Sequence, residues 1–303
     1  MELAIVTGMD QWAGLKALAL DSVTSPHSRR AYSTALDGFL GWYMGQEQHG
    51  LTKASVNGFR AHLESSGLAR ATVNLRLSAV RKLATEAADN GLLPAEIAAG
   101  VAHVKGLPAR GVRSGNWLTR EQAQRLLDAP DRATLKGKRD RALLAALLGC
   151  ALRRSEAAGL RVADVQQRDG RWVIADLQGK GGRVRTVPVP AWVKVAVDTW
   201  TEAAHITDGY LFRPVNKGGR TWGERLTDKA VALIASDAAH SIGVPAVAAH
   251  DLRRTSAKLC RLSGADLEQI QFLLGHASVQ TTERYLGGRQ NLTDAPNDHL
   301  GLQ

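Results

Sequence analysis

The chain has 303 residues and a formal net charge of +10, with a pI near 9.9. At roughly 100–200 residues per domain, this length predicts two domains. The positive charge favours a polyanionic partner, with nucleic acid ahead of an anionic membrane surface. No uninterrupted apolar run is long enough to span a bilayer, and the segment "MELAIVTGMD" lacks the positive start of a secretory signal. We therefore expect a cytoplasmic protein.

The two cysteines stand in apolar stretches. Cys150 and Cys260 show neither a paired spacing nor the spacing of metal ligands. The sequence therefore predicts buried free thiols, no structural disulfide and no zinc site. No metal and no cofactor is expected.

The N-terminal third has helical periodicity. Residues 25–45 begin with Ser25 and Pro26, a helix-start pair, and then place apolar side chains along one face. Residues 52–67 and 69–91 continue the pattern, and each ends at a glycine. These segments predict a small all-α domain over residues 1–106. Basic residues on or beside its helices are candidates for DNA contacts, although a solvated face explains many such charges: Arg29, Arg30, Arg70, Arg76, Arg81 and Lys82.

A segment without periodicity follows this domain. Residues 104–116, "VKGLPARGVRSGN", gather Gly, Pro and Arg between strongly patterned stretches. We place a linker at 107–116, a second domain at 117–289 and a C-terminal tail at 290–303.

The second domain mixes helices with a β-hairpin. Thr119 and Gln122 have the spacing of a capping box, and residues 140–152 are apolar nearly all round, which predicts a buried central helix. Residues 171–190 form two β-rich runs joined by Gly-Lys-Gly-Gly, so we expect a hairpin with Lys180 at its turn. From residue 222 onward the pattern is helical again.

Three short motifs have residues suited to chemistry. Arg153 and Glu156 follow the buried helix, His250 and Arg253 stand three positions apart, and "LLGHASVQTTERYL" at 273–286 contains a histidine and a tyrosine. Taken singly, each motif is weak. An Arg–Glu pair is often structural, and an isolated tyrosine on a helix is more often a packing residue than a nucleophile.

The order of these motifs is far more specific, and it resembles the tyrosine recombinase (phage integrase) family over nearly the whole chain. The resemblance includes "YLFRP" at 210–214. The ordered set is Arg153 with Glu156, Lys180, His250 with Arg253, "LLGH" ending at His276, and Tyr285 nine positions later. The resemblance implies a mainly α fold, with an N-terminal helical core-binding (SAM-like) domain and a C-terminal mixed α+β catalytic domain with a small β-hairpin or sheet. Together these domains would form a C-shaped clamp on duplex DNA.

Phosphoryl transfer on DNA accounts for the residue types. A phosphodiester is anionic and becomes more so in its transition state, so its site needs positive charge and hydrogen-bond donors. Arg153, Arg253 and His276 are expected to donate to the phosphate oxygens. Tyr285 is expected to attack phosphorus and form a covalent 3′-phosphotyrosine intermediate. Because the bond energy is retained, ATP is not needed.

The same chemistry requires two proton transfers. A phenol has an unperturbed pKa near 10, so Tyr285 needs a proton acceptor or a strongly cationic neighbourhood, and His250 is the nearest candidate acceptor. The resemblance implies that Lys180 protonates the leaving 5′-oxygen. Glu156 is expected to orient the site as a supporting carboxylate.

Two arginine doublets leave a choice. Arg153 and Arg253 match the spacing of the family, whereas Arg154 and Arg254 either contact the DNA backbone or are solvated. One departure lies near the end of the first domain, where family members often have an Asn-Pro turn and this chain has "LLPAEIAAGVAHVKG" at 92–106.

The expected function is that of a site-specific DNA recombinase or integrase. Its partner would be duplex DNA with paired inverted repeats, bound by a homotetramer made of two dimers. The alternatives are a type IB topoisomerase that relaxes DNA and a non-catalytic DNA-binding regulator. The complete set of catalytic residues argues against the regulator, and the helical N-terminal domain argues against the topoisomerase.

Overall fold

The computed structural model of the chain describes residues 9–46, 50–108, 116–179 and 182–286. Contacts divide the chain into two units, Met1–Val112 and Arg113–Gln303. The dividing point falls inside 107–116, the segment that the sequence predicts as a linker, while the individual domain bounds stay a prediction. Within the described ranges, no helix is long and apolar enough to cross a membrane.

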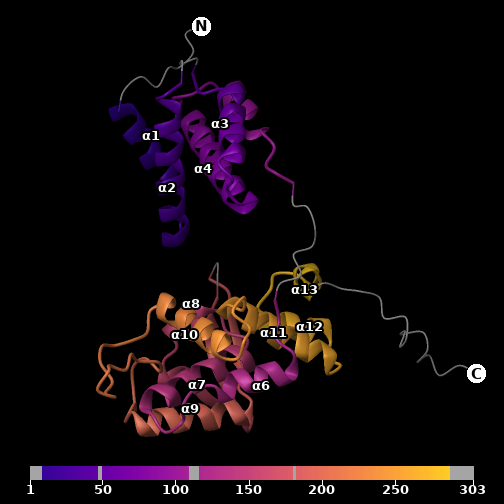
Figure 1. Cartoon of the computed structure of the whole chain (residues 1–303). Helices are drawn as coiled ribbons and strands as arrows, with labels where there is room; N and C mark the ends of the chain where they lie inside the picture. Colours follow the sequence, from indigo (N-terminus) through magenta and orange to yellow (C-terminus); the bar gives the residue numbers. More distant parts are fainter. Residues whose placement is uncertain (1–8, 47–49, 109–115, 180–181, 287–303) are drawn as a thin grey trace, which may run out of the picture. The chain divides into compact units, whose positions relative to one another are not determined.

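The N-terminal unit is a bundle of helices (Figure 1). Ser25 caps α2 by accepting the amide of Ser28, and Thr52 and Ser55 form a capping box at the start of α3. Two helices that the sequence did not predict, α1 and α5, complete the described part of this unit, and α5 lies in the stretch that lacks an Asn-Pro turn. The helices are α1 (Met9–Asp21), α2 (Pro26–Tyr43), α3 (Lys53–Ser65), α4 (Arg70–Asp89) and α5 (Ala95–Ala102).

Aromatic packing around Phe39 forms the centre of this unit. Phe39 is fully buried, and its ring centroid lies 4.9 to 6.2 Å from those of Trp12, Trp42, Tyr43 and Phe59. Buried aromatic rings at such distances stabilise a core beyond the area they bury. Helix α4 contacts α1, α2, α3 and α5, so it is the helix around which the bundle is built.

The C-terminal unit combines helices with a three-stranded antiparallel sheet in the order β1-β2-β3. The strands are β1 (Val165–Arg168), β2 (Arg171–Gln178) and β3 (Val184–Pro188). The predicted hairpin is therefore formed by β2 and β3, and β1 is an additional strand. The helices are α6 (Arg120–Asp128), α7 (Leu135–Gly149), α8 (Arg154–Gly159), the 3₁₀ turn η1 (Val162–Asp164), α9 (Ala191–Ala203), α10 (Asp228–Ser241), α11 (Ala249–Leu262), α12 (Leu267–Leu274) and α13 (Val279–Leu286).

Helix α7 is the predicted buried helix, and it begins earlier than its apolar run. Thr134 caps it by accepting the amide of Gly137, so the helix extends to the N-terminal side of the apolar segment at 140–152. Helix α9 packs along it, and a Cβ at Gly149 would stand 2.4 Å from Val193. Glycine at this position therefore allows the two helices to approach closely. Trp200 of α9 is fully buried there and donates its indole N–H to the carbonyl of Leu211 at 2.8 Å.

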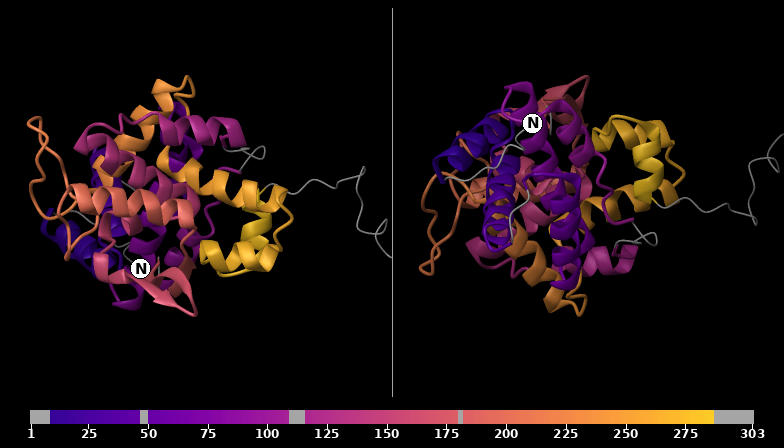
Figure 2. Two further views of the ribbon diagram at one scale, coloured as in Figure 1. Left: turned by 90° about the horizontal axis from the view of Figure 1, so that it is seen from below. Right: turned by 90° about the horizontal axis from the view of Figure 1, so that it is seen from above.

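The last helices gather at one end of the C-terminal unit (Figure 2). A small apolar cluster joins α11, α12 and α13 to the end of α7, and it contains Ala151, Ala257, Ile270, Leu274 and Leu286. Helix α12 also contacts β3. This packing brings the end of α7, strand β3 and the helices α11 to α13 to the same end of the unit.

Both cysteines are free, as predicted. Cys150 is fully buried, and burial raises the pKa of its thiol to about 12. Cys260 is only half-buried on α11, so the expectation of burial holds for one thiol and not fully for the other.

Candidate active site

Glu156 holds three arginines together at the start of α8. Its side chain is 4% exposed. Arg185 of β3 donates from Nη1 to Oε1 at 2.9 Å and from Nη2 to Oε2 at 2.8 Å. Arg153 donates from Nη1 to Oε1 at 2.6 Å, and its backbone amide donates to Oε2 at 2.8 Å, which caps the helix. Arg253 of α11 places Nη1 3.9 Å from Oε2.

These contacts keep the carboxylate ionised. Burial alone would raise the pKa of Glu156, but the hydrogen bonds and positive charges of Arg185 and Arg153 lower it to about 2. One negative charge thus faces three guanidinium groups. The cluster has a positive surplus that an anionic ligand could neutralise.

Arg253 is 1% exposed and is fixed by main-chain carbonyls. Nη1 donates to the oxygen of Ala151 and Nη2 to that of Leu274. Ala151 has a left-handed φ of +50°, an uncommon conformation for alanine, and its carbonyl accepts the Arg253 Nη1 bond. Burial and the neighbouring Arg153 lower the pKa of Arg253 to about 10, which leaves the guanidinium charged at neutral pH.

His276 follows the end of α12. Gly275 ends that helix with a φ of +60°, and a Cβ there would stand 2.8 Å from Cδ of Arg185. Glycine is therefore favoured at this turn for two reasons, its backbone conformation and the close approach of Arg185. Nδ1 of His276 lies 3.0 Å from Oγ1 of Thr282, which is fully buried. Burial and the charges of Arg253, Arg153 and Arg185 lower the pKa of His276 to about 4. Its imidazole is therefore neutral at neutral pH.

The ring of Tyr285 contacts the rings of both histidines. Its ring centroid is 5.7 Å from that of His250 and 5.3 Å from that of His276, in edge-on geometry with both. Its hydroxyl donates to the backbone carbonyl of His250 at 3.4 Å, which is a long hydrogen bond. Helices α11 and α13 thus bring the predicted tyrosine to the predicted histidines and arginines.

The charges around Tyr285 act in opposite directions. Burial raises the pKa of Tyr285, while Arg253, Arg254 and Arg153 lower it and Asp251 raises it. Burial, Arg254 and Arg253 lower the pKa of His250, so its neutral form is favoured and can accept a proton.

Lys180 lies outside the described residues, as do Gly181 and the tail at 290–303. The described ends of the hairpin are Gly179 and Gly182. A Cβ at Gly179 would stand 3.4 Å from Nη1 of Arg153 and 3.3 Å from Nη1 of Arg185. The strand that precedes Lys180 therefore reaches the arginine cluster.

The second members of the two arginine doublets have different surroundings. Arg154 is exposed at the start of α8. Arg254 is partly buried, and its guanidinium carbon lies 5.0 Å from the centroid of the Tyr285 ring. The sequence did not predict this contact, because it left Arg254 either on the DNA backbone or in solvent.

Most of the predicted DNA-contacting residues of the N-terminal unit already have partners within that unit. Arg29 pairs with Asp21 at 2.6 Å and Lys82 with Glu86 at 2.7 Å. Arg70 donates to the carbonyl of Pro108 at 3.5 Å and Arg81 to that of Val104, whereas Arg30 is exposed and Arg76 is half-buried. Their contacts with DNA stay a prediction.

Arg185 is the residue at this site that the sequence did not single out. Besides Glu156 it bonds the carbonyl of Leu273 from Nε at 3.2 Å, and its side chain is 9% exposed. It therefore ties the hairpin to α8 and to the turn before His276. An arginine in a β-rich run, two positions after Arg183, was the only available signal, and arginines on solvent-facing strand positions are common.

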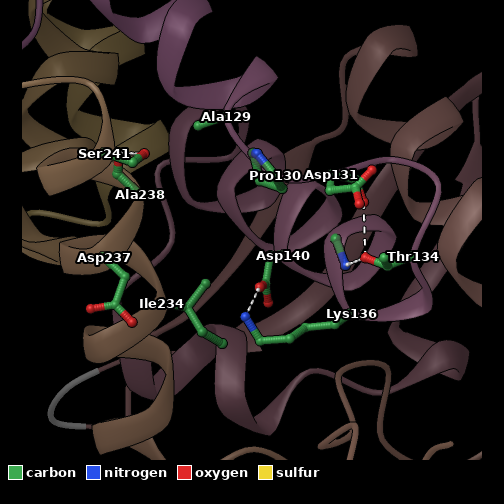
Figure 3. A pocket seen from close by; sticks show the side chains of 11 residues that line it. Ala129, Pro130, Asp131, Thr134, Lys136, Asp140, Ile234, Asp237, Ala238 and Ser241 are labelled. Atoms are coloured by element: carbon green, nitrogen blue, oxygen red, sulfur yellow. Dashed lines mark hydrogen bonds and ion pairs between the residues drawn. The ribbon is translucent and has the colours of Figure 1, made fainter. Parts of the chain in front are cut away.

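Hollows in the described part of the C-terminal unit include one beside the site and one away from it. One of about 490 Å³ lies between β3 and α12, and Arg185 and His276 line it. The other, of about 250 Å³, lies between the α6–α7 connection and α10, where Lys136 reaches Asp140 at 3.3 Å and Asp237 faces them across the opening (Figure 3). None of the predicted catalytic residues lines this second hollow, so the first is the one beside the site.

The low pKa of Glu156 makes stability depend on pH. A carboxyl with a pKa of 4.5 when unfolded and about 2 when folded stabilises the protein fully above 4.5, and this stabilisation is lost as the pH falls toward 2. Glu156→Gln should lower the unfolding free energy by on the order of 3 kcal/mol at neutral pH. The difference from the native chain should shrink through that acid window. Hydrogen exchange of the α7 amides measures the unfolding free energy of the C-terminal unit alone.

Glu202→Gln is the matched control, because Glu202 is exposed on α9 and has no ion pair among the described residues. It should leave the exchange rates unchanged at every pH. A deficit in Glu156→Gln that is the same at neutral and acid pH would contradict the ionised-carboxylate assignment.

Comparison with known proteins gives consistent matches. The Phage integrase family matches residues 116–291, and the family described as phage integrase, N-terminal SAM-like domain, matches residues 11–91. A tyrosine recombinase of Synechococcus elongatus is 29% identical over 99% of this chain and 96% of its own length. Tyrosine recombinase XerC of Rhodospirillum centenum is 33% identical over 91% of this chain and 80% of its own.

Solved structures agree in fold. A λ integrase (75–356) dimer bound to a COC′ core site has a TM-score of 0.70 at 16% identity, over 92% of this chain and 95% of that one. XerH site-specific recombinase bound to a difH substrate has a TM-score of 0.64 at 20% identity, over 85% and 75%. The mainly helical fold with SAM-like and catalytic domains is thereby confirmed. The chain belongs to the phage integrase family and is a tyrosine-type DNA recombinase.

Proposed function

We propose that this recombinase cuts and rejoins duplex DNA at specific sites through a 3′-phosphotyrosine intermediate at Tyr285, without a metal ion or ATP. The observation that supports this proposal best is the edge-on contact of Tyr285 with two histidines of lowered pKa, beside an arginine cluster with surplus positive charge. An anionic phosphodiester fits that surplus, and the nucleophile stands next to it.

The arginines retain donors for the phosphate. Arg253 has five N–H groups, and the carbonyls of Ala151 and Leu274 occupy two of them. Arg153 uses one side-chain N–H for Glu156, and its side chain is 27% exposed, which leaves the rest of its planar group for a non-bridging oxygen. Both guanidinium groups are held rigidly, so little reorganisation is needed when the negative charge grows.

His276 would add a donor as a neutral imidazole. A Thr282 hydroxyl that donates to Nδ1 leaves the ring proton on Nε2, where it can donate to a phosphate oxygen. The contact with Thr282 thus orients the ring as well as selecting its tautomer.

The proton balance uses His250 and Lys180. As the phenolic oxygen of Tyr285 forms its bond to phosphorus, the phenol proton passes to the neutral imidazole of His250. The bond from phosphorus to the 5′-oxygen breaks, and that oxygen takes a proton from Lys180. The approach of Gly179 to Arg153 supports this role, since it brings the strand that leads to Lys180 to the same cluster.

The DNA partner is proposed to be a site with paired inverted repeats, bound by a homotetramer of two dimers. The net charge of +10 suits a polyanion. Among the similar structures, λ integrase is bound as a dimer to a core site and as a tetramer to a Holliday junction. The match of the N-terminal unit to the SAM-like integrase domain supports recombination over simple relaxation. A relaxation assay on plasmids with and without the cognate site separates the two.

Replacing Tyr285 by phenylalanine tests the nucleophile. Tyr285→Phe removes only the hydroxyl, so DNA binding should persist while the covalent adduct disappears. A nicked suicide substrate traps the adduct, and a denaturing gel detects it. Tyr210→Phe is the matched control and should cleave normally, because Tyr210 belongs to the "YLFRP" segment away from this cluster. Adduct in the Tyr285→Phe variant would disprove the assignment.

Chelation tests the metal-free mechanism. Arginine, histidine and lysine side chains would supply the charge that a metal otherwise provides, so cleavage should survive EDTA unchanged. The measurement is adduct yield with and without the chelator. Lost activity that magnesium restores would count against the mechanism.

A sulfur-substituted substrate tests Lys180. Lys180→Ala should slow cleavage about 100-fold or more on ordinary DNA, which is the usual contribution of a general acid. When the scissile 5′-bridging oxygen is sulfur, the loss should largely vanish because a thiolate leaves without a proton. Single-turnover cleavage rates on both substrates measure this. An equal loss on both would remove Lys180 from the general-acid role.

A further inference from the structure

Arg254 lies over the ring of Tyr285, and an acidic partner fixes it there. Its guanidinium carbon is 5.0 Å from the ring centroid, within the range of a cation–π contact. Nη1 donates to Oδ1 of Asp251 at 3.2 Å, one turn earlier on α11. Asp251 is itself fixed, because its Oδ2 accepts the amide of Ala248 at 3.0 Å at the start of the helix. The arginine therefore has a defined position relative to the tyrosine.

The hydrogen bonds of Arg254 are incomplete. Its Nε is buried and has no partner in the described part of the chain. A buried donor without an acceptor is unfavourable, so this guanidinium is better satisfied when negative charge develops near it.

Two other arginines near Tyr285 have anionic or main-chain partners of their own, as Arg254 has Asp251. Arg253 bonds two carbonyls and faces Glu156 at 3.9 Å, and Arg153 pairs with Glu156 at 2.6 Å. His250 and His276 meet the ring edge-on, and both have lowered pKa values that favour their neutral forms. Asp251 raises the pKa of Tyr285, and it pairs with Arg254.

We propose that Arg254 is a positioning residue for the nucleophile: its guanidinium, held by Asp251, fixes the Tyr285 ring and stabilises the phenolate character that develops as the oxygen attacks phosphorus. This inference rests on the proposed role of Tyr285 as the nucleophile. A cation over an aromatic face attracts the neutral ring, and it attracts the phenolate more strongly because of the added charge.

Arg254→Gln and Arg254→Lys test the role in the full chain. An opposite charge a few ångströms from an acid lowers its pKa by about 1–3 units, so Arg254→Gln should raise the pKa of Tyr285 by about one unit. Arg254→Lys should restore most of the shift. The readout is the ultraviolet absorbance of the phenolate, taken as the difference between each protein and its Tyr285→Phe counterpart because the chain has four tyrosines. Circular dichroism identifies the pH range in which the fold persists.

Arg261→Gln is the matched control. Arg261 lies in the last turn of the same helix, is exposed, and donates to the carbonyl of Ala265 at 3.2 Å. Arg261→Gln removes the same charge from α11 but no contact with Tyr285, so the titration of Tyr285 should not change.

The pH profile of cleavage provides a second measurement. On the substrate with a bridging sulfur, which needs no proton from Lys180, Arg254→Gln should cleave about tenfold more slowly at neutral pH. The deficit should shrink as the pH rises, while the affinity for DNA stays that of the native chain. A loss that is equal at every pH, or a tyrosine titration that does not move, would overturn the proposal.

A contact with the DNA backbone gives a different result. If Arg254 contacted a DNA phosphate instead, Arg254→Gln would weaken DNA binding and reduce the dependence of binding on salt, with no change in the pH profile of cleavage. That outcome would also overturn the proposal. Failure of the underlying function is recognised separately, because then either the native chain forms no adduct or adduct still forms in Tyr285→Phe.

Discussion

The ion pairs of Glu156 are the interaction on which the rest of the catalytic unit depends. A single buried carboxylate receives Arg185 from the sheet and Arg153 from the start of α8, with Arg253 of α11 at 3.9 Å. Arg185 lies on the five-residue strand β3 and Arg153 stands at the start of the six-residue helix α8, so two of the three guanidinium groups come from short elements. Removing the carboxylate would leave buried positive charges uncompensated, which is far more costly than losing an exposed ion pair.

The same positive charge acts, together with burial, on the groups that are proposed to move protons. Burial and the charges of Arg253, Arg153 and Arg185 lower the pKa of His276 to about 4. Burial, Arg254 and Arg253 lower the pKa of His250 and favour its neutral form. A neutral imidazole can both accept and donate, whereas an imidazolium can only donate. Burial raises the pKa of Tyr285 and the arginines lower it, so the ionisation of this tyrosine depends on how closely the cations approach. Structure and acid–base chemistry thus have a common origin in the arginine cluster.

Sequence alone predicted the elements whose signals are local. Thr119 forms its capping box as expected, and the glycine-flanked hairpin is present. Helix α9 was missed because "AWVKVAVDTW" is rich in β-branched residues, and its helical form depends on packing against α7 through Gly149. The order of motifs indicated the candidate catalytic residues through resemblance to a family. Arg185 could not be found this way, since it meets Glu156 across 29 positions and only the folded hairpin brings them together.

The charge count of the cluster suits the change in charge during the proposed reaction. Three guanidinium groups and one carboxylate leave a surplus of about two positive charges at the phosphate position. A phosphodiester supplies one negative charge, and the trigonal-bipyramidal state formed on attack approaches two. The bound substrate therefore leaves the cluster incompletely neutralised, and the transition state neutralises it further. Glu156 accordingly has two effects. It lowers the free-energy cost of burying the arginine charges, and it keeps the net positive charge of the cluster close to the negative charge of the transition state rather than to that of the substrate.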